Sequence, residues 1–170
     1  MIVAGFADGH TAFLARAALA RLQSKLSLPA SDLAVITRAI DDYVSLQQII
    51  DLGDETESHE MFWRALVNLL FAGDDSTDTF GEHATARLAE IGIDTTFRRR
   101  VTKIIEPETA AVLVLVSEPS TRDGVLAVLR GSRGEIARTT LVGDDRETWE
   151  RAVHGRGESN DGGRDSRAGV

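Results

Sequence analysis

The sequence predicts an α+β fold in which two βαβ units flank a helical insertion. Both parts of the chain, residues 2–39 and 110–141, show a strand-like apolar run, an amphipathic helical stretch and a second strand pattern. The segment from about 58 to 105 has helical periodicity instead. With a returning strand before the insertion, this order is typical of a ferredoxin-like sandwich, in which helices back a sheet.

The first βαβ unit is marked by turn residues as well as by periodicity. Residues 2–6 have the pattern of a strand, and Asp8 is placed to cap the helix that follows, which ends before Pro29. Residues 33–39 and 43–50 are β-rich and flank Asp41 and Asp42, which predicts a hairpin. The apolar residues of the helix share one face: Ala15, Ala18, Leu19, Leu22 and Leu26.

The insertion is predicted to contain three helices. The first, residues 60–72, follows an acidic loop at 53–57 and is polar only at Glu60, Arg64 and Asn68. A break at 73–78 precedes the second helix, which Gly92 ends in the C′ position. Asp94 is placed to cap the third helix, which ends at Glu106 because Pro107 restricts the residue before it.

The second βαβ unit contains the clearest strand pattern of the chain, at residues 110–116. This run lacks polar alternation, which favours a central strand with helices on one face and another subunit as the candidate cover of the other. Ser120 opens a capping box for the next helix, which ends at Gly131. Residues 136–141 alternate as an edge strand does, and a short last helix holds Trp149 and Val153. We expect one domain over residues 1–153 and a disordered, glycine-rich polar tail over 154–170.

Composition excludes several functional classes. A formal net charge of -8 and a pI of about 5.0 oppose the binding of nucleic acid. The lack of cysteine excludes disulfides and thiol chemistry and suits a reducing cytosol, and residues 1–6 do not resemble a signal peptide. We therefore expect a cytoplasmic protein, with attachment to the membrane surface as the alternative. The basic cluster at Arg98–Arg100 and Lys103 is expected to be a solvated helix face, with an anion site as the alternative.

No catalytic, cofactor or metal motif is assembled. After His59 and Glu60, a zinc motif would need a second histidine where Trp63 stands. Residues 74–78 begin like a calcium loop, but Thr79 and Thr85 occupy the positions of its glycine and glutamate. We expect His83 at the surface, whereas His10, beside Asp8 in a strand-to-helix turn, is a candidate polar contact for a small ligand. The sequence thus predicts a protein that is not an enzyme, with no catalytic residue, cofactor or metal.

The apolar helix at 60–72 is the strongest functional signal. At about 1.5 Å per residue it is too short to cross a bilayer. It either packs in the core of its own chain or contacts a second subunit or a membrane surface. The candidate interface residues are Met61, Phe62, Trp63, Leu66, Leu70 and Phe71. Our leading hypothesis is a noncatalytic protein that forms a dimer through this helix and a sheet face. The alternatives are a peripheral membrane protein, and a small-ligand-binding module or enzyme with an unrecognised pocket.

Several segments resemble bacterial family 1269 of the domains of unknown function. They are residues 92–97, Glu106–Pro107, Ala110–Ala111, residues 113–116 and the central Phe62–Trp63. Members of that family are small and are often labelled as membrane or stress-associated proteins, without an established reaction. Relatives usually carry a glycine-rich apolar segment after the central tryptophan, where this chain has Arg64, Asn68 and an acidic loop. The resemblance therefore implies the architecture without an activity, and the departure favours a soluble member over one packed in lipid.

Overall fold

A five-stranded antiparallel sheet organises the chain, in the order β3-β2-β4-β1-β5. The computed structural model describes residues 1–47, 56–72, 79–143 and 146–155, and the structural statements below concern these residues. The strands are β1 (Ile2–Phe6), β2 (Leu33–Arg38), β3 (Val44–Gln47), β4 (Ala110–Val114) and β5 (Glu135–Arg138). Since β4 lies between β1 and β2 and is antiparallel to both, those two strands run parallel without touching.

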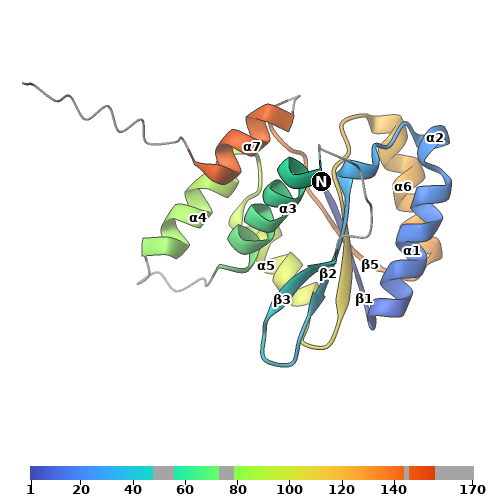
Figure 1. Cartoon of the computed structure of the whole chain (residues 1–170), viewed down its shortest axis with the longest axis horizontal. Helices are drawn as coiled ribbons and strands as arrows, with labels where there is room; N and C mark the ends of the chain where they lie inside the picture. The colour runs from blue at the N-terminus through green and yellow to red at the C-terminus, as the bar shows by residue number, and fades with distance from the viewer. Residues whose placement is uncertain (48–55, 73–78, 144–145, 156–170) are drawn as a thin grey trace, which may run out of the picture.

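Helices cover both faces of this sheet in a three-layer arrangement (Figure 1). One layer contains α1 (Gly9–Arg21), α2 (Gln23–Leu26) and α6 (Pro119–Gly131), and a 3₁₀ turn (Ala30–Asp32) leads into β2. The other contains α3 (Thr56–Phe71), α4 (Thr79–Glu90), α5 (Thr95–Ile104) and α7 (Arg146–His154). Strand residues alternate between the two layers, so Val112 packs towards α1 and α6 whereas Leu113 packs towards α3 and α5.

The order of elements and most of the predicted caps are confirmed. The Asp8 carboxylate accepts from the Thr11 amide at 2.8 Å, and Asp94 accepts from the Phe97 amide at 2.7 Å. Gly92 ends α4 with a φ of +83°, a left-handed conformation that favours glycine. These caps were predictable because each joins residues only a few positions apart in the sequence.

Three expectations about the second half were wrong. Strand β4 is central, but helices of the same chain cover both of its faces, which leaves no face for another subunit. Ser120 does not begin α6, because Pro119 takes the first helical position and Glu118 precedes it. Arg98 is 4% exposed rather than solvated. The predicted break at 73–78, most of the acidic loop at 53–57, residues 144–145, and residues 156–170 of the tail lie outside the described residues.

Candidate functional site

Helix α3 directs most of its apolar surface into the core of its own chain. Among the six candidate interface residues, Phe62, Trp63, Leu66 and Leu70 are almost fully buried, with Trp63 at 1% exposure. Helices α4, α5 and α7 together with strand β3 surround them. Met61 is 57% exposed and Phe71 is half-buried. The buried four are therefore held inside the chain, and contact with a partner is left to the rim of the helix.

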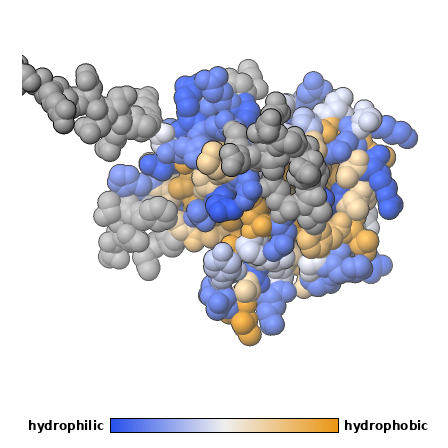
Figure 2. Space-filling view, in the orientation of Figure 1, coloured by the Kyte–Doolittle hydropathy of each residue, from blue (hydrophilic) through white to orange (hydrophobic). Residues whose placement is uncertain are grey.

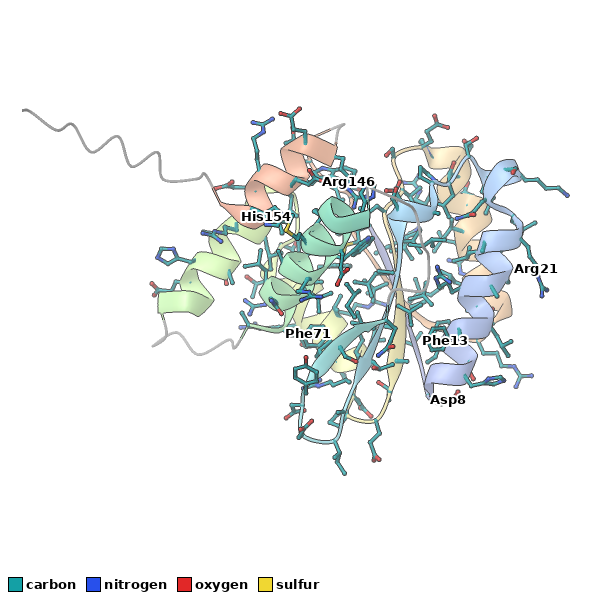
Figure 3. The ribbon with its side chains drawn as sticks, viewed as in Figure 1. Asp8, Phe13, Arg21, Phe71, Arg146 and His154 are labelled. Atoms are coloured by element: carbon teal, nitrogen blue, oxygen red, sulfur yellow. The ribbon has the colours of Figure 1, made fainter. Side chains whose placement is uncertain are left out.

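Arg146 anchors the start of α3 to the start of β2. Its Nη1 atom lies 2.7 Å from Asp32 Oδ1, and its guanidinium carbon lies 4.5 Å from the centre of the Phe62 ring. The Trp63 indole donates to the carbonyl of Ser31 at 2.9 Å. Burial raises the pKa of the Asp32 carboxyl, and the positive charge of Arg146 opposes that rise. In Figure 3, Arg146 reaches from α7 to the upper end of α3.

The opposite end of α3 lies against the β2–β3 hairpin. The guanidinium carbon of Arg38, the last residue of β2, lies 5.7 Å from the centre of the Phe71 ring. Arg38 also donates to the carbonyl of Ile105 at 2.6 Å and pairs with Asp42 at 2.9 Å. Figure 3 shows Phe71 at this lower end, near β3. Phe71 thus lies beside the β2–β3 hairpin at one edge of the sheet.

Arg98 holds the inserted helices together from within. Its Nε donates to the carbonyl of Leu70 at 3.1 Å, and its Nη1 donates to the Thr85 hydroxyl at 3.0 Å. These two bonds join α5 to α3 and to α4. The sequence prediction missed this role because both partners are distant in the chain, and three consecutive arginines looked like a solvated surface.

Strand β3 forms an edge of the sheet with outward-pointing backbone groups. In an antiparallel ladder, both backbone groups of a residue point to the same side, and successive residues alternate sides. The amide of Ala39 donates to the carbonyl of Tyr43 at 2.8 Å, so Tyr43, Ser45 and Gln47 face β2. Val44 and Leu46 consequently direct their N–H and C=O groups away from the sheet. Among the described residues, β3 pairs with β2 alone.

The other edge strand, β5, is protected against pairing with a further strand, and we call it the guarded edge. Met1 and Thr139 exchange both backbone hydrogen bonds, at 2.8 and 3.0 Å, so Ile136 and Arg138 point outward. Arg100 Nη2 donates to the outward carbonyl of Ile136 at 3.1 Å. Charged residues also begin and end this strand, a common protection against edge pairing. Strand β3, with the sequence Val-Ser-Leu-Gln, has neither a charge nor a proline.

The hairpin that carries β3 also exposes apolar side chains. Ile40 is 75% exposed and Tyr43 is 68% exposed, on either side of Asp41 and Asp42. Figure 2 shows hydrophobic colour at the lower tip of the molecule, where Figure 1 places this hairpin. Val44 and Leu46 are half-buried and pack against the α3 side of the core. We call the β3 strand with its outward Val44 and Leu46 backbone groups the open edge.

His10 and His83 do not assemble a reactive centre with their described neighbours. His10 and His83 are exposed, as is Asp8, whose carboxylate is occupied by Thr11. Hydrogen bonds from the Thr11 amide and hydroxyl lower the pKa of that carboxyl. Within the described ranges, no group of three or more histidine and acidic side chains is arranged to hold a metal ion. The helices in this part of the chain also include none that is long and apolar enough to span a membrane.

Comparison with known proteins identifies a family for this architecture. The model of the family described as "Protein of unknown function (DUF1269)" matches residues 60–154, more than half of the chain. The match runs from α3 to the end of α7 and so includes the helical insertion and the second half of the sheet. No curated protein and no solved structure matches the chain. The chain belongs to the DUF1269 family of proteins of unknown function.

Proposed function

We propose that this chain is a noncatalytic protein that self-associates as a two-fold dimer through the open edge. The observation that carries the proposal is the difference between the two sheet edges. Strand β5 has Arg100 on an outward carbonyl and charges at both ends, whereas β3 presents the backbone groups of Val44 and Leu46 without such protection. An unprotected edge is a template for another strand, because unpaired N–H and C=O groups gain hydrogen bonds there.

The open edge is complementary to itself. Opposite residues of paired strands place their side chains on the same face, so a two-fold axis perpendicular to the sheet must pass midway between the two copies of one residue. An axis between the two copies of Ser45 sets Val44 opposite Leu46 of the second copy. Both of these residues direct their backbone groups outward, so each pair exchanges two hydrogen bonds. The two sheets then become continuous across the axis.

This pairing also covers apolar surface beside α3. Val44 and Leu46 lie on the α3 side of the sheet, and both are partly exposed together with Phe71. In the proposed register, Val44 of one copy packs against Leu46 of the other on that face, a favourable cross-strand contact. The sequence predicted a subunit contact through α3 and a sheet face. The proposal assigns this contact to the exposed rim of the helix and to the adjacent strand β3, in place of the buried face of the helix.

A finer description of the fold accompanies this proposal. Strands β1, β2, β4 and β5 with helices α1 and α6 would form a ferredoxin-like core, with β3 added at one edge and α3–α5 inserted. The strand order and the position of α1 and α6 on one face support this description. In that fold the added strand would supply the dimer edge, and the inserted helices would form the second layer.

Light scattering coupled to size-exclusion chromatography tests self-association. Wild-type protein should elute with twice the 18.4 kDa mass of the chain. Ser45→Lys places two like charges opposite each other at the axis and should give monomer at the same concentration. Glu135→Lys changes charge on the guarded edge and should leave the dimer intact. Monomeric wild-type protein over the whole concentration range, or a Ser45→Lys variant that remains dimeric, would contradict the proposal.

A further inference from the structure

A cavity of about 740 Å³ lies at the opposite side of the sheet from the open edge. It forms where β1 begins and β4 and β5 end, between the start of α6 and helix α7. Its volume lies in the range of small-molecule sites, roughly 300–1,000 Å³. The lining combines apolar surface from Ile2, Val116, Leu141 and Trp149 with the polar groups considered next.

The polar lining has an excess of positive charge. Arg122 and Arg138 both line the cavity, and neither forms an ion pair with a carboxylate of the described residues. Glu118 is the one acidic side chain in the described lining, and it is exposed. The hydroxyl groups of Ser117 and Thr140 add neutral donors, whereas the Thr139 hydroxyl already donates to the carbonyl of Gly92 at 3.0 Å. This local balance is opposite to the net charge of -8 carried by the whole chain.

The start of α6 adds to the positive electrostatic potential of the cavity. Glu118 precedes the helix without a side-chain capping bond, so the first-turn amides lack the usual side-chain acceptor. Burial, with a smaller contribution from the charge of Arg122, lowers the pKa of the Met1 amino group to about 5. That amine is therefore uncharged at neutral pH. The cavity lining thus contains two arginine charges against one described carboxylate, that of Glu118.

We infer that this cavity binds a small organic oxyanion, a phosphate- or carboxylate-bearing compound held by Arg122 and Arg138. Guanidinium groups bind both anions through paired, charge-assisted hydrogen bonds. The Trp149 ring side of the cavity receives the apolar part of the compound, because the Trp149 indole N–H is already bonded to the carbonyl of Val142 at 3.0 Å. The site is separate from the open edge, so it does not depend on dimer formation.

Titration with inorganic phosphate at constant ionic strength, followed by amide and indole NMR shifts, tests the inference. Saturable shifts are expected at Ser117, Thr139 and the Trp149 indole. Arg122→Gln should weaken phosphate binding about tenfold or more, and the double variant with Arg138→Gln should abolish it. Arg130→Gln, on an exposed part of α6 outside the cavity, is the matched control and should bind as wild type does. Parallel titrations with acetate distinguish a phosphate site from a carboxylate site.

Three outcomes would overturn the inference. They are non-saturable shifts, equal affinities in Arg122→Gln and wild type, and binding that appears only after Asp144→Asn and Asp145→Asn. The last result would mean that carboxylates of the same chain already neutralise the arginines. The phosphate-free spectrum of each variant reports its folding, and Arg122→Lys, which retains the charge, should keep part of the affinity. Ser45→Lys should bind phosphate normally, which separates this inference from the proposed dimer.

Discussion

At the residue scale, arginine side chains make many of the hydrogen bonds that join separate helices and strands. Arg38, Arg98 and Arg100 each donate to a main-chain carbonyl of another element, and Arg146 combines such a bond with an ion pair. These contacts satisfy acceptors at helix ends and at the sheet edge. Arg146 is the most consequential of them, because it neutralises Asp32 while its guanidinium lies over the Phe62 ring.

Replacing Arg146 by methionine should lower the free energy of unfolding by about 2 kcal/mol at pH 7, because a partly buried carboxylate loses its partner. Burial already raises the pKa of Asp32, so its charged form costs stability above that pKa. Without Arg146 the pKa rises further. The deficit should therefore be largest at neutral pH and shrink near pH 4, where protonated Asp32 needs no counter-charge. Denaturant unfolding at both pH values measures this.

The double variant Asp32→Asn with Arg146→Met is the control for that experiment. It should lack the pH-dependent part of the deficit and retain only the loss of packing on Phe62. An Arg146→Met deficit of equal size at both pH values would show that the ion pair contributes nothing to stability.

At the scale of elements, the close approach of β1 to α5 depends on a small residue. A Cβ added at Gly5 would overlap Ile104 Cγ2 and lie 3.0 Å from the Ile104 carbonyl oxygen. At this position the backbone of β1 therefore lies directly against the Ile104 side chain of α5. Any larger residue must separate α5 from the sheet, which would disturb the helix layer that contains α3 and α5.

Gly5→Ala should reduce stability by about 1–3 kcal/mol, the usual cost of overpacking. Gly131→Ala is the matched control, because a Cβ there meets nothing within 4 Å. As a glycine in the last turn of α6, it should gain up to about 0.5–1 kcal/mol when replaced by alanine. Thermal unfolding of both variants checks the pair. A Gly5→Ala protein as stable as wild type would mean that α5 moves away freely.

Sequence patterns predicted the helices and strands better than they predicted which elements pack against one another. The helix caps at Asp8 and Asp94 and the turn at Gly92 were recognisable because their chemistry is local. The apolar helix α3 was also evident, but periodicity cannot tell which surface covers an apolar face. That cover comes from helices up to about ninety residues away, such as α7. The sequence therefore left the chain's own core and a second subunit both open as the cover, and our leading hypothesis chose the subunit.

The candidate sites were less predictable for the same reason. The open edge is defined by which strands end the sheet, and the order β3-β2-β4-β1-β5 cannot be read from the order of strands in the chain. The guard on β5 joins Arg100 to a carbonyl 36 residues away. Strand β3 did carry one local signal, since Val-Ser-Leu-Gln lacks the charge or proline that protects many edges.

At the scale of the whole molecule, each of the two sheet edges and the cavity has a separate proposed role. The open edge is proposed to join two copies, the guarded edge limits further sheet growth, and the cavity is formed around β1 beside that guarded edge. With one edge proposed to pair and the other protected, the expected assembly is a closed dimer rather than a fibre.

Disulfide trapping of Ser45→Cys tests the proposed register most directly. The chain has no cysteine of its own, so any cross-link must join the introduced residue to its copy. Opposite, non-hydrogen-bonded residues of paired strands have Cα atoms about 4.5 Å apart, within the range a disulfide requires. Ser24→Cys, exposed on α2, is the matched control for random collision. The account predicts rapid, reducible dimers for Ser45→Cys at low protein concentration. Cross-linking of Ser45→Cys no faster than of Ser24→Cys would contradict the account.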